Sequence, residues 1–308
     1  MPEAKLNHPW LVAVWPGMGH VALSAGYYLM SKLGMYAVAE LSANELFDVD
    51  FVEVKGGLIQ PGRRPRSRFF LWNDPNGRHD IVVFIGEAQP PAGKYAFCRR
   101  LVDYAKELGV ERIFTFAAMA TQMHPTGSSR VFGAATDPES LEELKNLDLE
   151  ILEDSTISGL NGVLLGAAAE MGMKGVCLLG EMPHLFVQLP FPKASLAVLE
   201  VFTTMARIDL DFTELQEQAQ NVENMLVDLM EKVERSLQGE ALSTEDEEPQ
   251  PEPEAKKLSS EDEAEIERLF KEAEKDRSKA YELKNVLDRL KVFREYEDRF
   301  LDLFKKSA

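Results

Sequence analysis

The turn that follows the first apolar run of the chain has the residue types of an anion-binding site. Residues 17–22, Gly-Met-Gly-His-Val-Ala, fit the pattern G-x-G-x-x-A after the apolar residues 10–15, and Glu40 ends the next apolar run. Glycines let backbone approach a phosphate, and a helix that starts here points unpaired N–H groups at it. Taken alone, the pattern indicates a dinucleotide site. Pro16 and His20 are unusual in such a turn, so an NAD-dependent enzyme is only a narrow alternative.

Polar residues also follow the other strands that we expect in a sheet. Because parallel strands end at one edge, we expect these side chains to surround a pocket there. The candidate ligand-binding residues are Gly17, Gly19, His20, Glu87, Gln89, Thr121, His124, Glu181 and His184. The histidines and glutamates among them can exchange protons. The structural alternative is that His124 and His184, each beside a proline, hold turns through hydrogen bonds.

The sequence lacks the patterns of common catalytic and metal sites. It contains no G-x-S-x-G elbow, and its five histidines never pair at H-x-x-x-H or H-x-H spacing. Its two cysteines, Cys98 and Cys177, form neither a disulfide framework nor a zinc spacing. We therefore expect no catalytic residue, no metal and no cofactor, which favours a protein that is not an enzyme.

Alternating β-rich runs and amphipathic helices over residues 10–207 predict an α/β fold. Buried strands are expected at residues 10–15, 36–40, 81–86, 113–119 and 176–181. Helices are expected at residues 21–33, 95–108, 138–146, 159–171 and 194–206, with Gly109 and Gly172 as C-terminal caps. Residues 50–54 and 68–73 have the pattern of an antiparallel excursion. The order of the elements predicts a mostly parallel sheet flanked by helices.

A different pattern begins near residue 211. Apolar residues recur with three-then-four spacing, which predicts a heptad-patterned helix over residues 208–238. Residues 239–258 have the composition of an acidic disordered linker. Residues 259–308 predict an amphipathic C-terminal helix that packs on the heptad helix, on the body or on another subunit. The expected oligomer or partner contacts are Leu215, Val222, Leu226, Leu229, Val233, Leu287 and Leu290.

Composition restricts the class of partner. The 308 residues carry a net charge of −18, which disfavours nucleic acid because phosphates would be repelled. A basic run with Arg63, Arg64, Arg66 and Arg68 is interpreted as a solvated loop that protects a sheet edge, in preference to an anion site. The first residues lack the pattern of a signal peptide, and no apolar run is long enough to cross a membrane. We expect a cytoplasmic protein that binds no membrane.

Six short motifs follow one another between residues 10 and 207. They are Pro16-Gly-Met-Gly-His20, Gly86-Glu-Ala-Gln-Pro90, Thr115-Phe-Ala-Ala-Met119, Ile157-Ser-Gly-Leu-Asn-Gly162, Gly180-Glu-Met-Pro183 and Pro192-Lys-Ala-Ser195. Together they resemble the proteasome assembly chaperone 2 family. The resemblance implies a three-layer α/β/α sandwich similar to nucleoside phosphorylases and hydrolases, and assembly into homo-oligomers. In some relatives it implies the guidance of proteasome subunits.

Two functional hypotheses remain for the core domain (residues 1–207) and its C-terminal additions. The favoured one is a non-enzymatic, homo-oligomeric assembly chaperone or scaffold that binds other protein subunits. Relatives that dock on the proteasome end in a hydrophobic residue, a tyrosine and one final residue, whereas this sequence ends Phe304-Lys-Lys-Ser-Ala308. The alternative is a small-molecule binding protein or hydrolase that uses the Gly17/Gly19 turn to bind a nucleoside- or nucleotide-like ligand.

Overall fold

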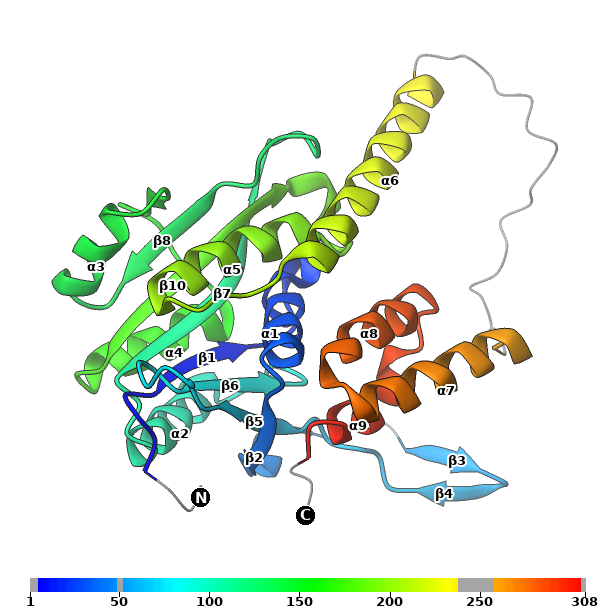
Figure 1. Ribbon diagram of the computed structural model, residues 1–308, viewed down its shortest axis with the longest axis horizontal. Helices are drawn as coiled ribbons and strands as arrows, with labels where there is room; N and C mark the ends of the chain where they lie inside the picture. Colours follow the sequence, from blue (N-terminus) through cyan, green and yellow to red (C-terminus); the bar gives the residue numbers. More distant parts are fainter. Residues whose placement is uncertain (1–4, 49–51, 238–257, 306–308) are drawn as a thin grey trace.

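The computed structural model describes residues 5–48, 52–237 and 258–305. Within them, eight strands form one mixed sheet in the order β2-β5-β6-β1-β7-β10-β8-β9, and β3 and β4 form a separate hairpin (Figure 1). The strands are β1 (Trp10–Val14), β2 (Tyr36–Glu40), β3 (Glu53–Lys55), β4 (Leu58–Gln60), β5 (Ser67–Trp72), β6 (Ile81–Gly86), β7 (Arg112–Thr121), β8 (Val131–Ala135), β9 (Glu150–Ile151) and β10 (Lys174–Pro183). The four central strands, β6, β1, β7 and β10, run parallel.

Helices cover both faces of the sheet. They are α1 (Val21–Lys32), α2 (Lys94–Glu107), α3 (Pro138–Lys145), α4 (Gly159–Glu170), α5 (Pro192–Ala206), α6 (Thr213–Leu237), α7 (Ser260–Lys275), α8 (Ala280–Arg289) and α9 (Phe293–Asp302). One apolar core joins α1 and α5 to Val12 and Val14, and a second joins α2 and α4 to Leu11 and Ala13. Alternate residues of β1 therefore face opposite layers. The predicted three-layer α/β/α sandwich is confirmed.

The expected elements of residues 10–207 lie within two residues of the observed ones. Apolar runs such as Ile-Val-Val-Phe-Ile in β6 are completely buried, as strands with helices on both faces require. Gly109 and Gly172 follow α2 and α4 with φ of 75° and 71°, the left-handed geometry of a glycine that ends a helix. The sequence pattern missed β4, β8 and β9. The two strands expected in the antiparallel excursion do not pair with each other in the described residues. β3 pairs with β4, whereas β5 lies between β2 and β6 in the main sheet.

The C-terminal residues form three helices where the sequence pattern predicts one. The chain turns after α7 at Asp276, whose side chain accepts a hydrogen bond from the Ser278 N–H, and it turns again at Lys291, where φ is +60°. Both turns let α8 and α9 fold back on the body (Figure 1). We refer to residues 259–305 as the C-terminal unit.

The C-terminal unit packs on its own chain. Tyr27 of α1 lies edge-on to Phe293 and Phe300, with ring centroids 5.5 and 5.7 Å apart. Phe304 is fully buried, and its carbonyl accepts a 2.6 Å hydrogen bond from the N–H of Ala37 in β2. The unit also contacts α6, where Gln218 donates to Asn285 Oδ1 at 3.0 Å and accepts from the Tyr281 hydroxyl. Of the three packing sites that the sequence leaves open for this unit, the structure therefore shows two, the body and the heptad-patterned helix of the same chain.

Candidate functional site

A cavity lies at the carboxyl ends of the parallel strands. The loop after β1 leads to α1 on one face of the sheet, and the loop after β6 leads to α2 on the other face. Neighbouring strands that connect to opposite faces leave a crevice between their loops, where α/β proteins bind ligands. Here the cavity measures about 380 Å³ and is lined by Gly17, Gln89, residues 117–120 of β7, residues 155–159 and Asn161.

Gln89 connects the loops around this cavity. Its Nε2 donates to the Pro16 carbonyl at 3.1 Å, and its Oε1 accepts from the Leu160 N–H at the start of α4 at 3.2 Å. Gly159 has φ of +72°, and a Cβ there would lie 3.2 Å from Gln89 Oε1. Of the nine candidate ligand residues, Gly17 and Gln89 line this cavity.

Other residues of the same chain fill the space beside Gly19, the second glycine of the first turn. The Gly19 N–H donates to the Val187 carbonyl at 2.9 Å, and a Cβ on Gly19 would meet the Met182 sulfur at 2.7 Å. Glu40, the acidic residue of the dinucleotide pattern, accepts hydrogen bonds from Arg66 instead. Burial lowers the pKa of the His20 imidazole, and Lys284 lowers it further.

The remaining candidates lie in separate hydrogen-bonded groups. Glu181 is buried and accepts hydrogen bonds from Arg130 and from the Thr121 hydroxyl, while the His184 ring is 3.1 Å from the Thr121 carbonyl. His124 Nδ1 lies 2.8 Å from the Thr126 hydroxyl within its own turn. Both histidines thus make local hydrogen bonds of the kind that hold turns, as the structural alternative expects. Their side chains and that of Glu181 do not meet Glu87 in one acid–base set.

The basic run pairs with carboxylates of the same chain. Arg63 lies 2.9 Å from both Glu87 and Asp298, and Arg68 contacts both as well. The Arg68 side chain is 7% exposed, so the interpretation of this run as a solvated loop is wrong at that residue. Asp298 belongs to α9, so these arginines attach the C-terminal unit to β5 and β6. A sequence separation of 230 residues between Arg68 and Asp298 hid this pairing.

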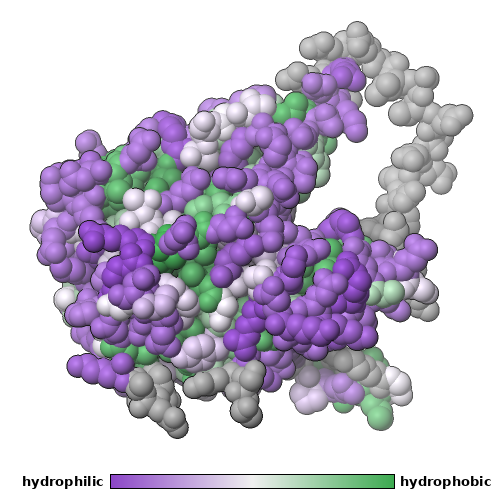
Figure 2. Space-filling view, in the orientation of Figure 1, coloured by the Kyte–Doolittle hydropathy of each residue, from purple (hydrophilic) through white to green (hydrophobic). Residues whose placement is uncertain are grey.

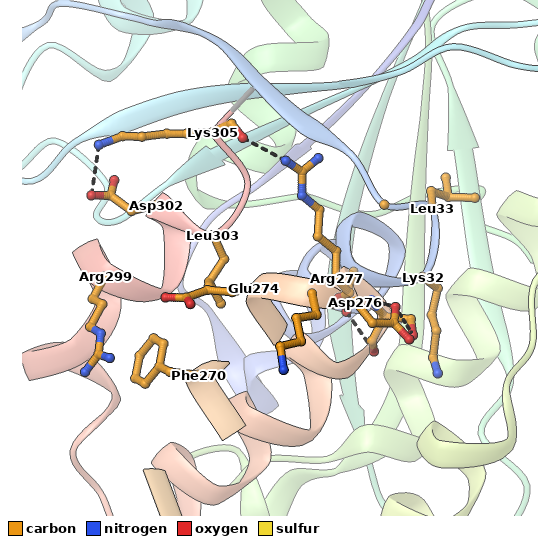
Figure 3. A pocket seen from close by; sticks show the side chains of 14 residues that line it. Lys32, Leu33, Phe270, Glu274, Asp276, Arg277, Arg299, Asp302, Leu303 and Lys305 are labelled. Atoms are coloured by element: carbon orange, nitrogen blue, oxygen red, sulfur yellow. Dashed lines mark hydrogen bonds and ion pairs between the residues drawn. The ribbon is translucent and has the colours of Figure 1, made fainter. Parts of the chain in front are cut away.

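A second cavity lies where α1, α7 and α9 end. It measures about 890 Å³, and Figure 3 shows charged side chains around it. Arg277 donates to the Lys305 carbonyl at 2.7 Å, and the Lys305 ammonium lies 2.9 Å from Asp302. Basic groups near helix C-termini offset the partial negative charge of the terminal carbonyls. These contacts hold the C-terminal unit to α1, which favours a structural role.

Glu297 makes the attachment of the C-terminal unit sensitive to pH. Burial and, to a lesser extent, the Glu87 charge raise the pKa of the Glu297 carboxyl from 4.5 to about 7, and Tyr27 donates a 3.2 Å hydrogen bond to it. The folded chain therefore binds more protons than the unfolded chain between these pH values, so this group costs stability as pH rises through 7. We expect Glu297→Gln to stabilise the protein by about 2 kcal/mol at pH 8 and by little at pH 4.

Urea unfolding of both proteins at the two pH values measures this difference. Glu295→Gln is the matched control, because Glu295 lies exposed on the same helix, and it should change stability equally little at both pH values. A gain from Glu297→Gln that is the same at pH 4 and pH 8 would contradict the assignment.

The expected contact residues divide between the interior and the surface. Leu215, Leu226 and Leu287 are fully buried, so this chain covers them itself. Val222 and Leu290 are half-buried. In contrast, Leu229 and Val233 are 40% and 51% exposed, where α6 projects beyond the body. Figure 2 shows hydrophobic surface on this end of α6 and on the β3–β4 hairpin.

No helix among the described residues is long and apolar enough to span a membrane. In the same part of the chain, no group of three or more His, Cys, Asp and Glu side chains is placed to hold a metal ion.

A family model and two curated proteins match most of the chain. The model of the PAC2 family matches residues 11–230. The uncharacterized protein MJ0106 of Methanocaldococcus jannaschii is 31% identical over 230 residues, 75% of this chain and 89% of that protein. The uncharacterized protein MJ1210 of the same organism is 26% identical over 224 residues, which are 72% of this chain and 83% of that protein.

Solved structures share the fold. Pyrococcus furiosus PbaB, described as an archaeal proteasome activator, is 25% identical with a TM-score of 0.63, and the match covers 74% of this chain and 96% of PbaB. A PAC2 family protein from Streptomyces avermitilis is also 25% identical, with a TM-score of 0.61 and coverage of 72% and 95%. Pyrococcus furiosus PbaA, described as an archaeal homolog of proteasome-assembly chaperone, has a TM-score of 0.58 at 25% identity, with coverage of 76% and 92%.

Proposed function

The chain belongs to the PAC2 family, and from that premise we propose that it is a non-enzymatic, homo-oligomeric assembly chaperone or scaffold of the cytoplasm that binds other protein subunits. The structural relatives described as a proteasome activator and as homologs of a proteasome-assembly chaperone support proteasome subunits as the partners.

One observation carries the proposal. Met225, Leu229 and Val233 lie on consecutive turns of α6 and are 51%, 40% and 51% exposed. Leu229 and Val233 continue the stripe in which Leu215, Ala219 and Leu226 are buried, and Met225 lies beside it. Apolar residues in a row on a projecting helix leave water when another polypeptide covers them, which favours association.

The experiment introduces charge into the stripe. Leu229→Glu combined with Val233→Glu should lower the affinity for the partner or for a second copy by about tenfold or more, because charged groups would have to be desolvated in the interface. Gln220→Glu combined with Asn224→Glu adds the same charge on the opposite, polar face of α6 and should bind like the unchanged chain.

Two measurements read the result: mass by light scattering, and binding of purified proteasome subunits from the source cell by surface plasmon resonance. Since α6 projects where these residues lie, the substitutions leave the fold of the body intact, which circular dichroism checks. Unchanged mass and unchanged subunit binding in the Leu229/Val233 variant would refute the role of this stripe. An unchanged chain that is monomeric and binds no subunit would refute the function itself.

A further inference from the structure

The cavity between the β1, β6 and α4 loops has a polar wall that is already in position. The two hydrogen bonds of Gln89 fix its amide between Pro16 and Leu160. Gly162 of α4 has no side chain, and a Cβ there would collide with the Ile157 carbonyl, so this glycine lets residues 155–158 lie directly against α4. A ligand that enters this space meets a wall that needs little reorganisation, which favours affinity.

The chemistry of the lining restricts the ligand. No charged side chain lines the cavity, and Ala117 and Met119 of β7, which face the α2 and α4 layer, give it an apolar wall. Opposite it lie the hydroxyl-bearing residues Ser155, Thr156 and Ser158. An ion would lose water here without a countercharge, which is costly. The start of α4 offers partial positive charge, but its Leu160 N–H is already bonded to Gln89.

Asn161 of α4 brings a buried polar atom without a hydrogen-bond partner to the lining. Its Oδ1 is buried and accepts no hydrogen bond from the described residues. A buried polar atom in this state costs stability. Rotation of the unbonded amide about its last side-chain bond brings either its oxygen or its nitrogen toward the cavity, so Asn161 can accept from or donate to a ligand.

We propose that this cavity binds an uncharged heterocycle with N–H or O–H groups, the chemistry of a nucleobase or nucleoside. The volume of about 380 Å³ lies at the small end of ligand pockets, which suits a one- or two-ring molecule. The ring packs on Ala117 and Met119 of β7, while Asn161 and the hydroxyl groups take its polar edge. This binding site is separate from the α6 stripe and does not depend on the proposed function.

A thermal-shift series with the full chain tests the proposal. The probes are adenosine, guanosine, cytidine and uridine, their free bases, and their 5′-monophosphates. At least one nucleoside or base should raise the melting temperature by about 5 °C at a concentration a hundredfold above its Kd. Its monophosphate should give a smaller shift, because the phosphate finds no cation in the lining. No shift with any probe, or a larger shift with a monophosphate, overturns the proposal.

Two variants locate the binding. Asn161→Leu should abolish the shift while leaving the ligand-free melting temperature unchanged or higher, because it removes the unpaired oxygen. If Asn161 had only a structural role, Asn161→Leu would lower the ligand-free melting temperature instead. Gly17→Leu should also abolish the shift, since a Cβ at Gly17 meets no atom within 4 Å and its extended backbone accepts any residue. A shift that persists in both variants places the ligand elsewhere and overturns the proposal.

Discussion

Gly180→Ala is expected to lower the free energy of unfolding by about 3 kcal/mol. Gly180 lies in the middle of β10, where a Cβ would be 2.5 Å from the Ala194 carbonyl oxygen and 2.8 Å from the Ala194 Cβ of α5. The nearest atom is backbone, so no side-chain rotation relieves the contact, and α5 must move away from the sheet. That movement opens gaps against Phe202, which packs on Phe114 and Phe116.

Chemical denaturation measures this effect, and the chain provides a matched control. Gly166 lies exposed in α4, and a Cβ there meets no atom within 4 Å. Gly166→Ala should therefore stabilise the protein by about 0.5–1 kcal/mol, as alanine does in a helix. If Gly180→Ala were as stable as Gly166→Ala, α5 would not be packed as tightly on β10 as the structure places it.

The contact of Gly180 with Ala194 also explains why six short motifs were enough to show the resemblance to the family. The motifs at residues 180–183 and 192–195 are separate in sequence but touch in space. Gly19 of the first motif likewise lies against Met182 of the fifth, and Gly162 against Ile157 within the fourth. These residues fix close approaches between loops, helices and strands. The motifs therefore identified the fold and the family, while most of their polar residues have structural contacts.

The sequence predicted the central strands and helices because each has a local signal. A buried run such as residues 81–85 and a glycine such as Gly109 need no information from distant residues. In contrast, β8 is short, contains Gly133 and pairs antiparallel with β10, so its residues show neither a long apolar run nor alternation. The break at Lys291 lacks the glycine that usually marks a left-handed residue.

The candidate site also combines features that have a local sequence signal with features that have none. The turn at Gly17 was found because glycine after an apolar run is conspicuous. Residues 155–159 were missed as a wall of the cavity because serine, threonine and isoleucine in a loop carry no distinctive pattern. The pairing of Arg68 with Asp298 depends on how the C-terminal unit folds back, which no local pattern encodes.

Removal of the C-terminal unit is expected to have the largest effect of any change considered. A chain that ends at residue 237 would expose Tyr27, Tyr28 and Phe70, which now pack on aromatic rings of α8 and α9 and on Phe304. It would also leave the buried Arg68 without Asp298. Each of the three exposed aromatics costs about 2 kcal/mol, so the body should lose about 6 kcal/mol and about 12–24 °C in melting temperature. Increased binding of a hydrophobic dye should accompany the loss.

A protease site between Gln238 and Gly239 separates the contribution of the interface from that of the covalent connection. After cleavage, the fragment with the C-terminal unit should stay with the body in gel filtration, because its aromatic and ionic contacts do not need the connecting chain. Arg68→Ala in the cut protein leaves Asp298 without the buried arginine that it contacts and should promote release. Fragments that separate at once, with a body as stable as the full chain, would contradict this packing.

Because the body depends on the C-terminal unit for stability, truncation changes stability and assembly together. A shortened chain that forms smaller oligomers has lost the C-terminal unit, but its body is also destabilised, so the change in mass has two causes. The Leu229/Val233 variant keeps the C-terminal unit and changes the projecting end of α6 alone. If that variant loses partner binding while the cut protein retains it, the binding surface is α6, and the C-terminal unit serves to complete the fold.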